Sequence, residues 1–219
     1  MPKSAVQQKS VVVRGPHAER TAAMRQRLID AAIHCLHTVG YAATTTQLVV
    51  ETAEVSRGAI LHHFPTKVDL MLAVAEYAAG KQNRHVGRIL REVPEGIQRY
   101  MAITDATWSA MKQPAAQAFL EIMMASRSEL ELAERLAPVI ASLESFQRES
   151  VWETARDLGV KDRETVVTMV RLHVAAMRGI AIELNVLGNE QVAEDCMALL
   201  NRYKRFLTSE LLTKPGLEG

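Results

Sequence analysis

Residues 40–70 read GYAATTTQLVVETAEVSRGAILHHFPTKVDL and contain two short helical segments on either side of a tight turn. Thr44 opens the first segment with a capping-box pattern, because its hydroxyl can accept the N–H of Gln47 while the Gln47 side chain reaches back. Ser56 follows the turn as the expected N-cap of the second segment, which must stop before Pro65. Two capped helices at this spacing predict a helix-turn-helix unit.

A helix-turn-helix unit places its second helix in the major groove of DNA, which is about 12 Å wide, and offers the first residues of that helix to base edges. Arg57 is the expected direct reader, because a guanidinium can bond guanine O6 and N7 together. Thr45, Thr46 and Lys67 stand at helix starts, where hydroxyls, free N–H groups and an ammonium can meet phosphates. Gln47 has two candidate roles, as a capping residue or as a contact to phosphate or base.

The same stretch resembles the TetR family of bacterial transcriptional regulators, whose pattern runs Gly-aromatic, Thr-Thr, a short helix, Val-Ser-x-Gly and His-Phe-Pro-x-Lys. The matching positions are Gly40, Tyr41, Thr44, Thr45, Val55, Ser56, Gly58, His63, Phe64, Pro65 and Lys67. The resemblance implies that the helix after Ser56 is the recognition helix and that Gly58 lets its backbone approach DNA closely. The residues expected at the DNA are Thr45, Thr46, Gln47, Arg57, Gly58, Ala59, Leu61, His62, His63 and Lys67.

Three positions depart from the family pattern. Leu61 stands where the family usually has a tyrosine, whose hydroxyl commonly contacts phosphate. Glu54 occupies the turn position that is commonly glycine, and Val50 replaces a small residue in the first short helix. The lost hydrogen bond and the added acid together are worth about 1–3 kcal/mol. DNA binding is therefore expected to survive, with modest affinity or with help from the basic N-terminal segment.

The composition of the whole chain favours an all-α protein of about nine helices. Only 5% of its 219 residues are aromatic, while helix-forming residues are plentiful. Breaks between helices are expected near Pro94, Pro114, Gly159 and Gly188, and Pro138 should kink or split a long helix. No run reaches 18 uninterrupted apolar residues, so no membrane span is predicted. The two widely separated cysteines indicate a reducing cytoplasm rather than a disulfide framework.

The net charge of +1 conceals an uneven distribution. Residues 1–70 carry eight Lys or Arg against five Asp or Glu, whereas the remainder carries 18 against 20. A basic N-terminal third on a mildly acidic body predicts two separate tasks. We expect a flexible basic arm over residues 1–17, a helix-turn-helix DNA-binding domain over 18–66, and a helical ligand-binding and dimerisation domain over 67–219. The arm is equally compatible with an inert leader.

The last two expected helices carry the signal for a dimer. Residues 172–187 read LHVAAMRGIAIELNVL and are apolar nearly all round, so a second copy of the chain is the expected cover for one side. The final helix has an apolar stripe and an opposite charged face that includes Lys204. The family resemblance implies a four-helix bundle between two copies, with half-sites about 34–36 Å apart. The expected interface residues are Val174, Met177, Ile180, Ile182, Leu199 and Tyr203.

Residues 94–158 hold most of the remaining methionines and aromatic residues. Such side chains can line an adaptable pocket for an apolar molecule, and they can equally form a plain core. The family resemblance supports a pocket whose occupancy spreads the two DNA-binding heads and releases DNA. His173, Arg178 and Glu183 either orient a polar end of the ligand or form interface pairs. The expected pocket residues are Met101, Trp108, Phe119, Met123, Phe146 and His173.

Neither a metal site nor a cofactor is expected. His34 and His37 have metal-ligand spacing, but no acidic cluster completes a site, so we interpret them as ordinary helix residues. The chain also lacks a Gly-rich phosphate loop, a Gly-x-Ser-x-Gly elbow and a His-Glu-x-x-His motif. The sequence therefore argues against an enzyme.

Together these observations predict a cytoplasmic, homodimeric TetR-like regulator, a repressor released from a palindromic operator by a small apolar ligand. Two alternatives stay open. Leu61 and Glu54 are the support for a small-molecule sensor or carrier that does not bind DNA. A helical enzyme would use Glu183 or His173 in a central cavity, without any motif behind it.

Overall fold

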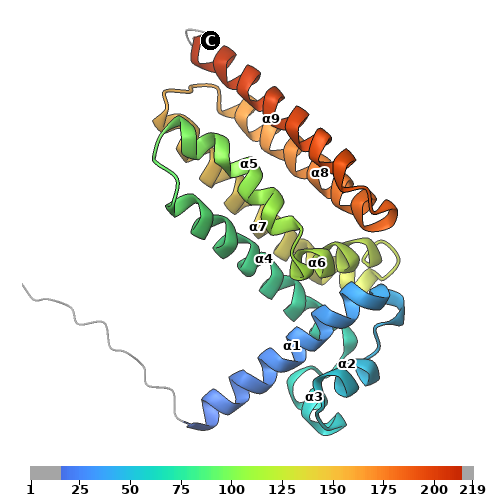
Figure 1. The fold of residues 1–219 in the computed structure, drawn as a ribbon. Coiled ribbons are helices and arrows are strands. Elements are labelled where there is room, and N and C mark those ends of the chain that lie inside the picture. The colour runs from blue at the N-terminus through green and yellow to red at the C-terminus, as the bar shows by residue number, and fades with distance from the viewer. Residues whose placement is uncertain (1–15, 214–219) are drawn as a thin grey trace, which may run out of the picture.

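The computed structural model describes residues 16–213, and in that range the chain forms nine α-helices and no strand (Figure 1). The predicted all-α class is confirmed. The basic arm expected over residues 1–17 lies almost wholly outside the described residues. The helices are α1 (Pro16–Ala43), α2 (Thr46–Ala53), α3 (Arg57–His63), α4 (Lys67–Arg91), α5 (Ile97–Met111), α6 (Pro114–Ala125), α7 (Leu130–Asp157), α8 (Arg163–Leu187) and α9 (Glu190–Thr213).

Helix boundaries follow local sequence signals. Ser56 caps α3 by accepting the Ala59 N–H at 3.3 Å, as predicted. Thr66 and Asp69 form a complete capping box at the start of α4. The expected cap of α2 is one residue off: Thr45 accepts the Leu48 N–H at 3.1 Å. The Thr44 hydroxyl instead donates to the Gly40 carbonyl at 2.7 Å, because Thr44 is buried beneath the end of α1.

The predicted breaks near Pro94, Pro114, Gly159 and Gly188 all fall between helices or at a helix start. Gly188 has φ 67°, a conformation that L side chains rarely adopt, and it terminates α8. Pro138 does not split its helix, because α7 continues through it to Asp157.

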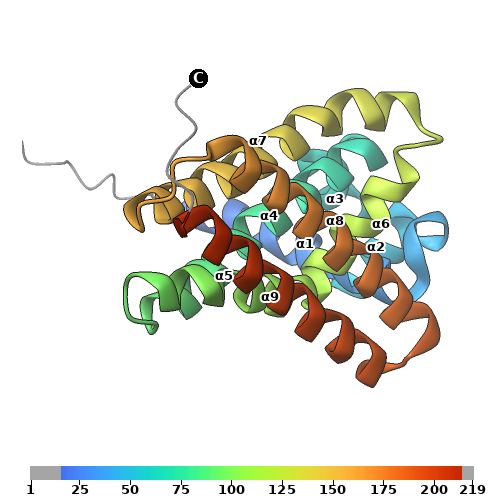
Figure 2. The same ribbon diagram turned by 90° about the horizontal axis from the view of Figure 1, so that it is seen from above.

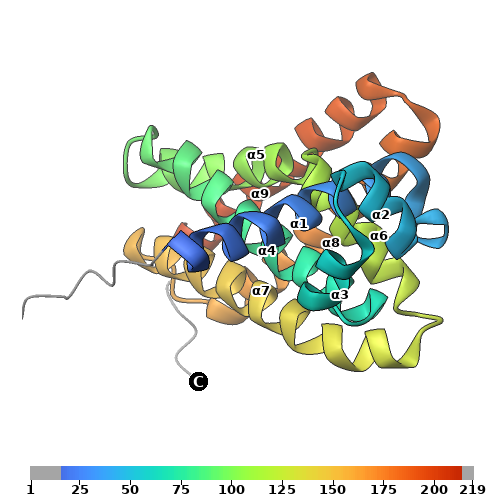
Figure 3. The ribbon, with the colours of Figure 1, turned by 90° about the horizontal axis from the view of Figure 1, so that it is seen from below.

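The helices form a head and a body (Figure 1). Helices α1, α2 and α3 lie at one end, and Figure 3 views the molecule from that end with α3 on the surface. Helices α4, α5, α7, α8 and α9 pack side by side in the body, and α6 contacts both α1 and α4. One apolar core continues from the head into α4, α6 and α7, while a second core fills the space among α5, α7, α8 and α9.

Helix α8 lies beside α9 along one edge of the body (Figure 2). By length and composition alone, α8 is apolar enough to cross a membrane, although it contains no uninterrupted run of 18 apolar residues. A core helix meets the same criterion, and α8 packs against α5, α7 and α9. We therefore interpret its apolar character as packing within the body and as the exposed edge described below.

Candidate functional site

Helix α3 is anchored by one face and exposes the other. Ile60 and the following Phe64 are buried in the head core, which fixes the helix against α1 and α2. Arg57, Gly58 and His62 are exposed on the opposite side. A short helix held rigidly from behind presents its first turn to a groove without further ordering.

Arg57, which the sequence predicts as a base reader, stands at the exposed start of α3. It is the first residue of α3, directly after the Ser56 cap, and it is exposed. Among the described residues it makes no ion pair or hydrogen bond, so its guanidinium keeps all its donors for an incoming acceptor. Leu61 is also exposed, by 51%, and the chemistry that it offers to DNA is an apolar contact such as that with a thymine methyl group.

The start of α2 lies beside α3 and offers polar groups at an exposed edge. Thr45 and Gln47 are exposed, and Thr46 is half-buried. The Gln47 amide donates to Glu51 Oε1 at 2.7 Å, so the predicted capping role of Gln47 is not realised. Its side chain lies along the exposed face of α2.

Glu54 forms the turn between α2 and α3 in the left-handed conformation, with φ 51° and ψ 49°. Its Oε2 atom lies 3.5 Å from Nη2 of Arg27, which is on α1. Both side chains are largely exposed, so this ion pair is weak. It nevertheless places a positive charge next to the acid that departs from the family pattern.

The two histidines at the end of α3 differ in environment. His62 is exposed, whereas His63 is half-buried with its ring centroid 5.2 Å from that of His62. Burial lowers the pKa of His63 below its ordinary value, and the neighbouring His62 and Arg25 charges lower it further. The ring of His63 is therefore less accessible than that of His62.

Lys67 is directed toward the protein interior rather than toward the expected phosphate. Its Nζ atom donates to the Tyr41 carbonyl at 3.0 Å and lies 4.0 Å from the centroid of the Tyr41 ring. Burial lowers the pKa of Lys67, and the charge of Glu129 opposes that shift. The Tyr41 hydroxyl donates to Glu129 Oε2 at 2.7 Å, and the Tyr41 N–H donates to Glu121 Oε2 at 3.0 Å.

We call these four residues, Tyr41, Lys67, Glu121 and Glu129, the head–body clamp. They join the end of α1 to the start of α4, to α6 and to the N-terminal edge of α7. Sequence reasoning missed the clamp because its members are up to 88 positions apart. The burial of Lys67 and Tyr41 raises the strength of each contact relative to an exposed pair.

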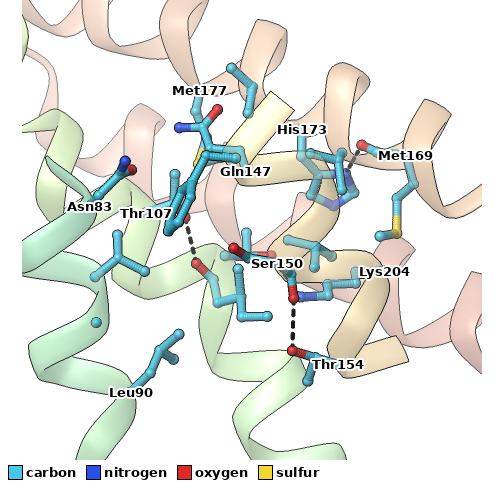
Figure 4. Close-up of a pocket in the computed structure, with 18 residues that line it drawn as sticks. Asn83, Leu90, Thr107, Gln147, Ser150, Thr154, Met169, His173, Met177 and Lys204 are labelled. Carbon is cyan, nitrogen blue, oxygen red and sulfur yellow. Dashed lines mark hydrogen bonds between the residues drawn. The ribbon is translucent and has the colours of Figure 1, made fainter. Parts of the chain in front are cut away.

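The body contains a cavity of about 200 Å³ lined by residues of α4, α5, α7, α8 and α9 (Figure 4). Of the predicted pocket residues, Phe146 and His173 line it. Trp108 and Phe119 do not, because they are buried in the second and first apolar cores respectively. Met101 and Met123 pack against those cores instead. The full lining is Asn83, Val86, Gly87, Leu90, Ile103, Thr104, Thr107, Phe146, Gln147, Ser150, Val151, Thr154, Met169, Val170, His173, Val174, Met177 and Lys204.

Two further polar residues considered from the sequence lie outside this cavity. Glu183 is exposed on the surface of α8, so it supplies no catalytic group to the interior. Arg178 lies 3.7 Å from Glu144 across α7 and α8 and forms an intramolecular ion pair. Among the described residues no group of three His, Cys, Asp or Glu side chains has the arrangement of a metal site.

The predicted dimer residues divide into two groups. Val174 and Met177 are buried within the chain and line the cavity, and Ile180 is half-buried against the second apolar core. Ile182, Leu199 and Tyr203 are exposed, and Leu199 and Tyr203 are at least half exposed. The structure adds neighbours on the same two helices and their junction that sequence reasoning had not chosen: Leu172, Val186, Leu187, Val192 and Phe206.

Comparison with known proteins places the head in a described family. The sequence model of the bacterial regulatory proteins of the tetR family matches residues 28–74, which span most of α1 through the start of α4. The HTH-type transcriptional regulator CymR of Pseudomonas putida is 30% identical over 182 residues, which cover 77% of this chain and 83% of that protein.

Solved structures share the whole fold. A TetR transcriptional regulator from Chloroflexus aurantiacus superposes with a TM-score of 0.70 at 23% identity, covering 84% of this chain and 96% of that one. The multidrug binding protein EbrR, in complex with imidazole, superposes with a TM-score of 0.59 at 21% identity, covering 89% and 98%. These superpositions show that the helical body, as well as the head, shares its fold with these structures.

Proposed function

This chain belongs to the TetR family of bacterial transcriptional regulators, and from that membership we propose that it is a homodimeric repressor released from a palindromic operator by a small molecule in the body cavity. DNA-binding regulation, rather than catalysis, is the function of its relatives. The exposed first turn of α3, with an unpartnered Arg57 on a rigidly anchored helix, is the observation that carries the proposal.

At the DNA, Arg57 reads a base, while Gly58 and Ala59 allow close approach of the α3 backbone. Thr45, Thr46, His62 and His63 contact phosphates, Gln47 contacts phosphate or base, and Leu61 makes an apolar contact. Lys67 supports the site from behind by holding Tyr41. Contacts to phosphate position the head, and the contact to a base supplies sequence discrimination.

The partner in the dimer is a second copy of the chain. Helices α8 and α9 expose a run of large apolar residues along one edge of the body, among them Ile182, Leu199, Tyr203 and Phe206. Exposed apolar surface of this extent on two adjacent helices is typical of an association surface. A two-fold axis through that edge gives two α3 helices for two half-sites.

Release of DNA follows from the position of the cavity. Helix α4 lines the cavity through Asn83, Val86 and Leu90, and its first residue, Lys67, belongs to the head–body clamp. A ligand that prefers a shifted α4 therefore moves the head and favours the released state. EbrR, whose fold is similar, was solved with a small molecule bound.

The test is a fluorescence-anisotropy titration of the full chain with DNA from the region upstream of its own gene. We expect binding that weakens steeply with salt, by about 10³-fold between 50 and 200 mM for a protein with six phosphate contacts. A scrambled duplex serves as the control for sequence preference. Undetectable binding, or binding that salt leaves unchanged, would instead support the sensor or carrier that does not bind DNA.

A further inference from the structure

A lysine is buried at the cavity wall without an acidic partner. Lys204, on α9, is only 2% exposed, and its Nζ atom donates to the Tyr100 carbonyl and to Thr104 Oγ1. The same atom lies 4.3 Å from the centroid of the Tyr100 ring. Among residues 16–213, no carboxylate lies within ion-pair distance of it. Two of its three N–H donors are used, and one is left.

Burial lowers the pKa of Lys204 from its ordinary value to about 7, and the charge of Asp105 opposes the shift. Asp105 itself is exposed and accepts a hydrogen bond from Asn201 at 2.6 Å. An ammonium held in an apolar interior without a counterion is unfavourable, so this position gains from any anion that reaches it.

A second nitrogen faces the same space. His173 is 5% exposed, and its Nδ1 atom lies 2.8 Å from the Met169 carbonyl. A carbonyl only accepts, so Nδ1 carries the proton and donates. Within residues 16–213, Nε2 has no partner at hydrogen-bond distance. Figure 4 shows His173 among the residues that line the cavity. Burial lowers the pKa of His173, the carbonyls of Met169 and Leu200 oppose that shift, and the charge of Lys204 adds to it.

The remaining wall is mainly apolar, with Phe146, Val170 and Met177 among its larger side chains. The cavity of about 200 Å³ exceeds the roughly 150 Å³ that accommodates a benzene ring in an engineered protein core. Its interior thus fits a ring or a short aliphatic chain, and Lys204 and His173 stand on its wall. The polar side chains of Asn83, Thr107, Gln147, Ser150 and Thr154 also line it.

We propose that the cavity selects a monocarboxylic acid with an apolar body, whose carboxylate lies between Lys204 Nζ and His173 Nε2. One carboxylate oxygen accepts the free N–H of Lys204. The acid that enters in its protonated form transfers its proton to His173, and Nε2–H then donates to the second oxygen. The site gains one cation and one anion, so the charge of the interior is unchanged. This inference rests on the proposed function of the cavity as the effector site.

The test is isothermal titration calorimetry of the full-length protein without DNA at pH 7. The probes are two matched pairs, phenylacetate with phenylacetamide and hexanoate with hexanamide, which differ only in the charged group. We expect at least one carboxylate to bind about 10-fold or more tightly than its amide. Equal affinities within both pairs, tighter binding of the amides, or no binding by either carboxylate would overturn the proposal.

Two variants test which residues cause the preference for a carboxylate over its amide. Lys204→Met, which keeps the chain length and removes the charge, should abolish the preference for carboxylate over amide, and His173→Phe should reduce it. Lys161→Met is the matched control, because Lys161 is exposed and lies outside the cavity. A carboxylate preference that survives in Lys204→Met would also overturn the proposal. Circular dichroism checks that each variant folds. If one does not, the comparison of carboxylate with amide binding to the wild-type protein still tests the proposal.

Failure of this inference is separable from failure of the proposed function. The calorimetry contains no DNA, whereas the anisotropy titration contains no ligand. A protein that binds its upstream DNA but shows no carboxylate preference would keep its role as a regulator and lose this effector class. A protein that prefers carboxylates but ignores DNA would be a sensor or carrier.

Discussion

Glu54 shows how a single residue adjusts the turn between α2 and α3. Among the described residues it is the non-glycine residue with a positive φ, and its carboxylate lies beside Arg27. The left-handed conformation is unfavourable for a residue with a Cβ atom. Arg27 partly offsets the charge through an exposed ion pair. The backbone conformation of Glu54 therefore affects the stability of the head, whereas its charge affects the affinity for DNA.

The variant Glu54→Gly should separate these contributions from each other when it is compared with Glu54→Gln. Glycine adopts positive φ without a Cβ clash, so we expect the free energy of unfolding to rise by about 0.5–1 kcal/mol. Glutamine keeps the strain and removes only the charge. Both variants should bind DNA more tightly than wild type, but urea denaturation should show a gain for glycine alone. Equal stability of the two variants would contradict the role of backbone strain.

Lys204 provides a prediction on stability and pH. Its pKa is about 7 in the folded chain, well below the ordinary value that it regains on unfolding. Between these values the unfolded chain binds more protons, so stability rises as the pH rises through that interval. His173, the Tyr100 hydroxyl and Asp105 also face this site, and replacing Lys204 removes the charge that helps to lower the pKa of His173.

Lys204→Met should therefore be more stable than wild type at pH 6, because the buried charge is gone. The difference in free energy of unfolding between this variant and wild type should shrink by about 2 kcal/mol between pH 6 and pH 9, because Lys204 in the folded wild type is neutral at pH 9. Urea denaturation at the two pH values measures it, with Lys161→Met as the control that shows no such trend. An advantage independent of pH would mean that Lys204 keeps its ordinary pKa in the folded protein and stays charged from pH 6 to pH 9.

At the scale of elements, α3 depends on two anchors and one cap. Ile60 and Phe64 fix it from within, Ser56 fixes its first turn, and everything else on the helix is available to a partner. The helix has only seven residues, so its stability comes from this packing rather than from its own hydrogen bonds. Surface substitutions on α3 are accordingly expected to change binding more than folding.

Arg57→Ala should lower the ratio of operator affinity to random-duplex affinity by about 10-fold or more, because a bidentate contact to guanine is worth about 1–3 kcal/mol. His62→Ala is the matched comparison on the same helix. It should weaken binding to both duplexes alike, since phosphate contacts carry no sequence information. Anisotropy titrations at fixed salt measure both ratios. An unchanged ratio in Arg57→Ala would assign base reading to another residue.

The whole molecule combines a head that carries the helix-turn-helix with a helical body that contains the cavity. The clamp at Tyr41 and Lys67 joins the two, and one apolar core passes through that joint. The edge formed by α8 and α9 is the place that we propose for the dimer axis, because its large apolar residues are exposed within residues 16–213.

Leu199→Asp combined with Tyr203→Asp should convert the dimer into a monomer, because burying two carboxylates at an apolar contact is unfavourable. Sedimentation velocity measures the change, and operator affinity should fall with it. Leu130→Asp is the control, since Leu130 is 74% exposed and apolar but lies on α7. A double variant that sediments as wild type would place the interface elsewhere.

Local signals determined much of this fold in advance. The bounds of α3, the Ser56 cap, the Thr66 capping box and the breaks near Pro94 and Gly188 depend on residues within about four positions of each other, which sequence displays directly. The helix-turn-helix and its exposed Arg57 follow from the same short-range chemistry.

Burial of particular side chains was decided by packing alone. Lys204 was assigned to the charged face of α9, yet it shares the inner face with Met197 and Thr208. Lys67 was expected at a phosphate, yet it holds Tyr41. In both cases the deciding neighbours come from helices far away in the chain. Which face of a helix is covered depends on contacts between distant segments, and periodicity within one helix does not contain that information.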